Sequence, residues 1–155
     1  IVEVDGLLCR VSDINLRTTT VLGRDDKYII LPNSTLTKNK IINWSYGDLA
    51  SRFFVSVGVG YTSDITLVKK LLQEIIDHQA EVLKSPQPFV RFVDFADSYL
   101  LFSVYFWSED VYGVENIKSE IRTKIFEKFN ENDIDIPLPQ RVLHFDKSAD
   151  KPKDS

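Results

Sequence analysis

The sequence predicts a mixed β and α+β fold, in which a small Sm-like or SH3-like β barrel precedes a ferredoxin-like βαββαβ domain. Residues 1–46 contain about five short β-rich segments separated by turn signals. Residues 52–145 then alternate between strand-like and helix-like periodicity in the order β-α-β-β-α-β. Residues 146–155 carry almost no apolar side chains, which predicts a disordered tail.

The first region is expected to consist of short strands, because threonine and aliphatic residues alternate along it. Residues 23–26, Gly-Arg-Asp-Asp, give a turn signal between two of them. Pro32 has no backbone N–H group to donate to a neighbouring strand, so it ends the next strand, and Asn33 and Ser34 favour a turn there. Closure of these strands into a barrel removes exposed strand edges. The expected strands are residues 1–4, 7–20, 28–31 and 41–44.

The second region shows two amphipathic helical patterns separated by a predicted hairpin. Ser63 or Asp64 is placed to cap the first helix, and residues 96–98 form the hairpin turn. A change in apolar pattern near residues 45–51 marks the boundary between the two regions. The expected helices are residues 65–79 and 114–129, and the expected strands are residues 53–61, 89–95 and 99–107. Residues 136–139 and 142–145 begin a terminal extended segment, which completes the β-α-β-β-α-β order.

The inventory of reactive residues argues against catalysis and against a bound cofactor or metal ion. His78 and His144 are far apart and stand in no ligand-spaced motif. The single cysteine, Cys9, cannot form an internal disulfide and is expected to be buried. Residues 58–60, Gly-Val-Gly, lack the third glycine of a dinucleotide-binding loop and suit close packing in a strand instead. The sequence therefore predicts a protein that is not an enzyme, with no catalytic, metal-binding or cofactor-binding residues.

Nucleic-acid binding is disfavoured by the net charge of −4. Aromatic residues are frequent in the predicted strands, and aromatic side chains on a sheet can stack bases. The neighbouring strand residues are mainly serine, valine and acidic residues, so we expect the aromatic residues to pack in the core. Asp94, Asp97 and Ser98 are expected to bond backbone groups in the hairpin turn.

The ends of the chain are also informative. No segment approaches the ~18–20 apolar residues of a membrane-spanning helix, and no signal peptide is visible. Methionine is absent, even at the first position. We therefore expect the chain to be a fragment excised from a larger protein.

Residues 11–21, 31–34, 42–45 and 136–140 carry an ordered set of short motifs. This set resembles the small-conductance mechanosensitive channel family, MscS. The set extends through residues 57–64 and Pro88, so that it covers nearly the whole chain apart from the tail. Two positions depart from the family pattern: Cys9 and residues 132–133 stand where glycine is usual. The residues that we assign to the motifs, in a structural role, are Arg17, Thr19, Pro32, Asn33, Ser34, Asn43, Trp44, Ser45, Pro137, Pro139 and Gln140.

The resemblance implies a homoheptameric channel for ions in the cell inner membrane, with a role in osmotic stress. It implies that this region lies on the cytoplasmic side, scaffolds the oligomer and filters solutes and ions below a tension-gated pore. The lipid bilayer would be contacted by helices outside this chain, and nucleic acid is not an expected partner. Two alternatives stay open at this point: a stand-alone regulatory module that binds a small molecule, and a nucleic-acid-binding protein of Sm and RRM type.

Overall fold

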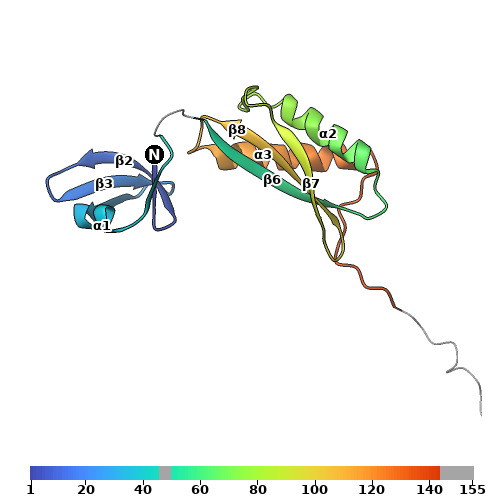
Figure 1. Cartoon of the computed structure of the whole chain (residues 1–155), viewed down its shortest axis with the longest axis horizontal. Coiled ribbons are helices and arrows are strands. Elements are labelled where there is room, and N and C mark those ends of the chain that lie inside the picture. The colour runs from blue at the N-terminus through green and yellow to red at the C-terminus, as the bar shows by residue number, and fades with distance from the viewer. Residues whose placement is uncertain (46–49, 144–155) are drawn as a thin grey trace, which may run out of the picture.

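The computed structural model describes residues 1–45, here called the first unit, and residues 50–143, the second unit (Figure 1). The first unit contains β1 (Val2–Val4), β2 (Leu7–Ile14), β3 (Thr18–Gly23), β4 (Tyr28–Pro32), α1 (Asn33–Lys38) and β5 (Ile41–Asn43). The second contains β6 (Ser51–Val59), α2 (Ile65–Asp77), β7 (Phe89–Phe95), β8 (Leu100–Ser108) and α3 (Val114–Glu131). The predicted mixed β and α+β class is confirmed.

The first unit is a five-stranded antiparallel sheet with the order β4-β3-β2-β1-β5. The sheet is open, which corrects the expected closed barrel. Strand β5 has only three residues and pairs with β1, while β4 pairs with β3. Within the described residues, the outer edges of β4 and β5 therefore face no partner strand.

Two local differences from the prediction occur in this unit. Residues 7–20 form two strands rather than one, and the turn between them is closed by a 2.8 Å hydrogen bond from Asn15 N to Thr18 O. Residues 33–38 form helix α1 where only a turn was expected. Pro32 precedes this helix with φ −59° and ψ 136°. The positive charge of Lys38, in the last turn, stabilises the helix because it lies at the negative end of the helix dipole.

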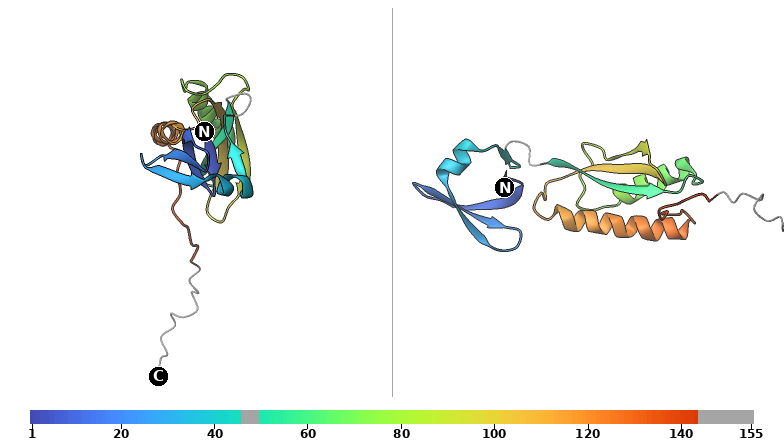
Figure 2. Two further views of the ribbon diagram at one scale, coloured as in Figure 1. Left: turned by 90° about the vertical axis from the view of Figure 1, so that its left-hand side faces the viewer. Right: turned by 90° about the horizontal axis from the view of Figure 1, so that it is seen from below.

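The second unit is a two-layer structure. Its sheet has the order β6-β8-β7, all antiparallel, and helices α2 and α3 pack on one face of it (Figure 2). Asp64 caps the start of helix α2: its carboxylate accepts hydrogen bonds from Thr66 N at 2.8 Å and Leu67 N at 3.2 Å. Its fully buried side chains, Val68, Leu72 and Ile76, follow the predicted stripe.

The predicted last strand is absent from the described part of the second unit. Residues 132–143 follow α3 without forming a strand, so the observed order is βαββα. Pro137 and Pro139 have no N–H group to donate to a sheet. The segment is joined to the end of β6 by a 3.0 Å hydrogen bond from Gly60 N to Asp135 O. The rest of this predicted strand and the tail, residues 144–155, lie outside the described residues.

The two units differ in the amount of apolar surface that they bury. In the first unit, only three hydrophobic side chains are buried: Val4, Cys9 and Val21. In the second, one continuous core includes Phe102 and Phe106 from the sheet and Phe129 from α3, all fully buried. The second unit therefore supplies most of the hydrophobic core among the described residues.

Candidate functional site

Asn33 is the centre of a hydrogen-bond network that joins two separate motif segments. Its Oδ1 accepts from the Thr19 hydroxyl at 2.8 Å, and its Nδ2 donates to Asn15 O at 2.9 Å and Leu16 O at 3.3 Å. Its backbone N donates to Arg17 O at 2.9 Å. Asn33 therefore ties the start of α1 to the turn between β2 and β3.

The turn between β2 and β3, which this network holds, carries exposed apolar side chains. In the turn that Asn33 holds, the exposed fraction is 94% for Leu16 and 71% for Ile14. The side chains of Arg17, Pro32 and Ser34 are exposed too. Thr19, in contrast, is buried, with its hydroxyl bonded to Asn33. The motif thus has one buried polar contact and an exposed outer surface.

The second motif cluster, residues 43–45, lies where the first unit meets the second. The Trp44 indole N–H donates to the Glu3 carboxylate at 3.2 Å, and its ring stacks on Phe53 with centroids 6.0 Å apart. Asn43 Oδ1 accepts from Ser45 N at 3.0 Å. Phe53 belongs to the core of the second unit, so Trp44 connects the β5 end of the first sheet to that core.

Tyr112, just before α3, makes a further contact between the units that the sequence did not indicate. Its hydroxyl donates to Gly23 O at 2.7 Å, and its ring lies beneath the guanidinium groups of Arg10 and Arg24, at 5.2 and 5.7 Å. Arg24 Nη2 also donates to Val111 O at 3.1 Å. These bonds and the Trp44 stack fix the junction at two separate points.

The third group of motif residues lies at the opposite end of the second unit. Pro137 lines a hollow with Gly58 and Tyr99, and Gln140 N donates to the Ser98 hydroxyl at 3.2 Å. Pro139 lies between them in the same extended segment. The structure therefore brings the motif residues together in three places, and these places do not form one common site.

Gly58 confirms the expectation of close packing. A Cβ atom there would lie 2.6 Å from the Tyr99 ring. Cys9 is fully buried, as expected, and burial raises the pKa of its thiol. His78 is exposed at the end of α2, with Nδ1 2.7 Å from Glu74 O.

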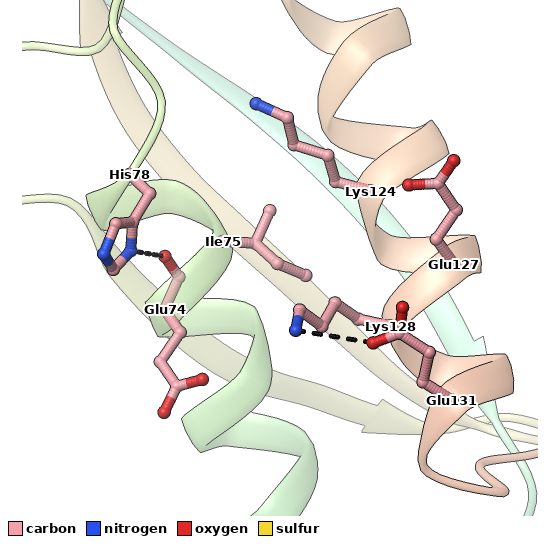
Figure 3. A pocket seen from close by; sticks show the side chains of 7 residues that line it. All are labelled: Glu74, Ile75, His78, Lys124, Glu127, Lys128 and Glu131. Atoms are coloured by element: carbon pink, nitrogen blue, oxygen red, sulfur yellow. Dashed lines mark hydrogen bonds and ion pairs between the residues drawn. The ribbon is translucent and has the colours of Figure 1, made fainter.

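A groove between α2 and α3 is a candidate pocket of about 350 Å³ (Figure 3). It mixes carboxylates with ammonium groups, and Lys128 pairs with Glu131 at 3.4 Å. Lys124 Nζ donates to Oε1 of the buried Gln79 at 2.6 Å. In residues 1–45 and 50–143, no three metal-ligating side chains gather in one place. Both ammonium groups of the groove, those of Lys124 and Lys128, are thus engaged within the protein, which suits a structural contact between helices.

The aromatic residues of the sheet divide between its two faces, which corrects the expectation that they all pack in the core. Phe53, Phe102 and Phe106 face the helices and are buried. On the other face, Phe54 is 56% exposed and Tyr105 is partly exposed, and their ring centroids are 5.8 Å apart. Strict alternation along β6 separates Phe53 from Phe54, and this signal was available in the sequence.

Comparison with known proteins identifies relatives along almost all of the chain. Residues 1–46 match the family model described as "Mechanosensitive ion channel, beta-domain", and residues 54–136 match "Mechanosensitive ion channel MscS, C-terminal". An uncharacterized MscS family protein of Synechocystis is 34% identical over 92% of this chain and 48% of its own length. The small-conductance mechanosensitive channel of Helicobacter pylori is 33% identical over 89% of this chain and 50% of its own length. The chain thus spans about half the length of these curated relatives.

Solved structures agree with these matches. The closed-state crystal structure of Helicobacter pylori MscS superposes with a TM-score of 0.85 at 29% identity, over 95% of this chain and 58% of that one. Arabidopsis thaliana MSL1 shares the fold, with a TM-score of 0.69 at 13% identity over 89% of this chain and 50% of that one. No helix in the described parts of this chain is long and apolar enough to cross a bilayer. The two family matches, in this order and over these residues, show that the chain belongs to the MscS family of mechanosensitive ion channels.

Proposed function

We propose that this chain forms the cytoplasmic part of a tension-gated ion channel. There it would hold the subunits in register and enclose a chamber that filters ions and solutes on their way to the pore. The observation that carries the proposal is the order of the two family matches, beta-domain over residues 1–46 and C-terminal domain over residues 54–136. The site residues suit such a role because they bond backbone and pack, and none is arranged for chemistry.

The open sheet of the first unit supports the scaffolding role. The free edge of β4 carries Tyr28 and Ile30, each 67% exposed, and the free edge of β5 carries Ile41 and Ile42, 38% and 39% exposed. Unpaired edges with apolar side chains favour pairing with another chain. Contact between two different edges is head-to-tail, and it produces a ring when the rotation between neighbours closes. We propose self-association of this kind, with seven copies as the MscS resemblance implies.

The remaining partners follow from the same proposal. Tension in the inner membrane would act on bilayer helices outside this chain, and the first and second units would lie below them on the cytoplasmic side. Permeating ions would meet the charged surfaces of the chamber before the pore, since rings of like charge bias which ions enter. The physiological role would be the release of solutes under osmotic stress.

The test is electrical recording from the full-length protein in liposome patches under suction. Discrete currents that appear with tension are expected, and silence up to the tension that ruptures the patch, with insertion verified, would contradict the proposal. A Tyr28→Lys/Ile30→Lys variant places two charges on the free β4 edge and should reduce both oligomer and current. Val93→Lys, at a valine 46% exposed on β7 of the second unit, is the control and should leave both unchanged.

A further inference from the structure

The face of the second sheet that the helices leave uncovered carries an arginine–aromatic patch. Three strands supply it, and its members are Arg52, Phe54, Phe89, Arg91, Tyr105 and Trp107. Tyr105 lies at its centre on β8, the middle strand. It stacks with Phe89 at 5.0 Å between centroids and with Phe54 at 5.8 Å. The patch is therefore one continuous surface and not a set of isolated side chains.

The two arginines of the patch approach its centre from opposite sides. Arg52 on β6 lies over the Tyr105 ring at 5.8 Å, and Arg91 on β7 lies over the same ring at 5.6 Å and over Phe89 at 4.9 Å. Both side chains are exposed. Neither guanidinium has an ion-pair or hydrogen-bond partner among the described residues. The patch thus presents two available cations on an aromatic base.

This composition is typical of the energetic centre of a protein–protein interface. Tyrosine, tryptophan and arginine are enriched among the residues that contribute most to binding, since they combine a large contact area with directional bonds. Arginine in particular forms bidentate pairs with carboxylates. The expected occupant is therefore a protein surface that offers carboxylates beside an apolar group.

The chain itself carries such a surface on the opposite side of the same unit. The outer side of α3 has a shallow hollow of about 620 Å³, hereafter the α3 hollow, which contains the carboxylates of Glu120 and Glu127 and one ammonium group, that of Lys124. The buried Gln79 side chain engages two of these groups: its Oε1 accepts from Lys124 Nζ at 2.6 Å, and its Nε2 donates to the Glu120 carboxylate at 2.8 Å. The Glu127 carboxylate has no hydrogen-bond or ion-pair partner among the described residues. Phe126, 57% exposed, lies beside the hollow, because it is three residues along α3 from Thr123, which lines it. The α3 hollow therefore complements the arginine–aromatic patch in charge and in apolar character.

We propose that the arginine–aromatic patch of one copy packs against the α3 hollow of the next copy. The two surfaces belong to opposite layers of one two-layer unit, the sheet and the helices. A contact between them is necessarily head-to-tail, which is the geometry that generates a ring. This inference rests on the proposed function, because it assumes that copies of the chain assemble, and it adds a contact between second units to the edge pairing of the first units.

The test is charge reversal in the full-length protein, with oligomeric state measured by light scattering after chromatography over a dilution series. Arg52→Glu/Arg91→Glu should raise the concentration at which half of the subunits are assembled by about tenfold or more, and so should Glu120→Arg/Glu127→Arg. The chain that combines all four changes should recover assembly, because glutamates on the patch of one copy then face arginines on the α3 hollow of the next. Lys69→Glu/Lys70→Glu on α2 is the control with the same number of reversed charges and should assemble as the wild type does.

Unchanged assembly of both double variants, or loss without recovery in the fourfold variant, would overturn the inference. Salt-dependent binding of a short oligothymidylate to the wild-type patch, abolished by Arg52→Glu/Arg91→Glu while assembly is unaffected, would overturn it in favour of a nucleic-acid surface. These results are separable from a failure of the proposed function. In that case the wild-type protein itself would neither assemble nor conduct under tension.

Discussion

Replacing Asn33 by alanine removes the side chain that holds the turn between β2 and β3. The change deletes the acceptor of the Thr19 hydroxyl at 2.8 Å and the donor to two turn carbonyls at 2.9 and 3.3 Å. One such hydrogen bond contributes ~1 kcal/mol, and a buried polar group left without a partner costs ~1–3 kcal/mol. Thr19 is 3% exposed, whereas Asn33 is only half-buried. We therefore expect the first unit to lose about 2 kcal/mol of its free energy of unfolding.

The assay is urea unfolding followed by Trp44 fluorescence in a Trp107→Phe background, so that the signal comes from the single tryptophan at the junction end of the first unit. A loss of this size should lower the midpoint by about 1–2 M urea. The matched control is Asn39→Ala, whose side chain donates to the exposed Asp5 carboxylate at 3.0 Å and should contribute about 0.5 kcal/mol or less. A midpoint for Asn33→Ala no lower than that of Asn39→Ala would refute the reasoning.

Three further results are expected. Gly58→Ala should destabilise the second unit by ~1–3 kcal/mol, because the added Cβ would lie 2.6 Å from the Tyr99 ring; thermal unfolding measures this, and Tyr99→Leu in the same chain should restore much of the loss. Tyr112→Phe deletes the hydroxyl bond to the first unit, so amide exchange at the junction should accelerate about fivefold, corresponding to ~1 kcal/mol, and unchanged exchange would contradict a role in fixing the units. The hydrogen bond from Lys118 holds the pKa of Glu115 below its ordinary value of 4.5, so this carboxylate stabilises the fold above that value and the contribution is lost as the pH falls through the lowered pKa. The stability difference between wild type and Glu115→Gln, from urea unfolding at several pH values, should therefore shrink on acidification, and a difference that grew would have the wrong sign.

The second unit was the more predictable one, because its structure is encoded in local periodicity. The stripe that includes Val68 and Leu72 predicted α2, and the acidic residue Asp64 marked its start. The turn between β2 and β3 was missed because it contains no glycine or proline. It is held by the side chain of Asn33, which is distant in sequence from Asn15, and such a long-range bond leaves no local signal.

The candidate site could be predicted in its residue types but not in its arrangement. The motif residues Asn33 and Trp44 were singled out, yet their bonds to Thr19 and Glu3 depend on strand pairing. The arginine–aromatic patch was missed because composition was weighed without separating the two faces of each strand. The predicted last strand has no partner strand within the described residues, so its β-like sequence pattern alone was not enough to make it a strand.

The unequal burial of the two units has a consequence for how such a protein matures. Only three apolar side chains of the first unit are buried, whereas every residue of its sheet loses backbone entropy when it is ordered. Burial within one subunit therefore stabilises this sheet only weakly. Any surface that covers the exposed side chains of Ile14, Leu16 and Ile30 would add hydrophobic stabilisation to the first unit. Under the proposed assembly, the stability of the first unit becomes a function of subunit concentration, as for any fold linked to binding. Newly made subunits would then carry a well-packed second unit and a first unit that gains full stability only when neighbours arrive, which makes incomplete assemblies the natural targets of cellular proteases.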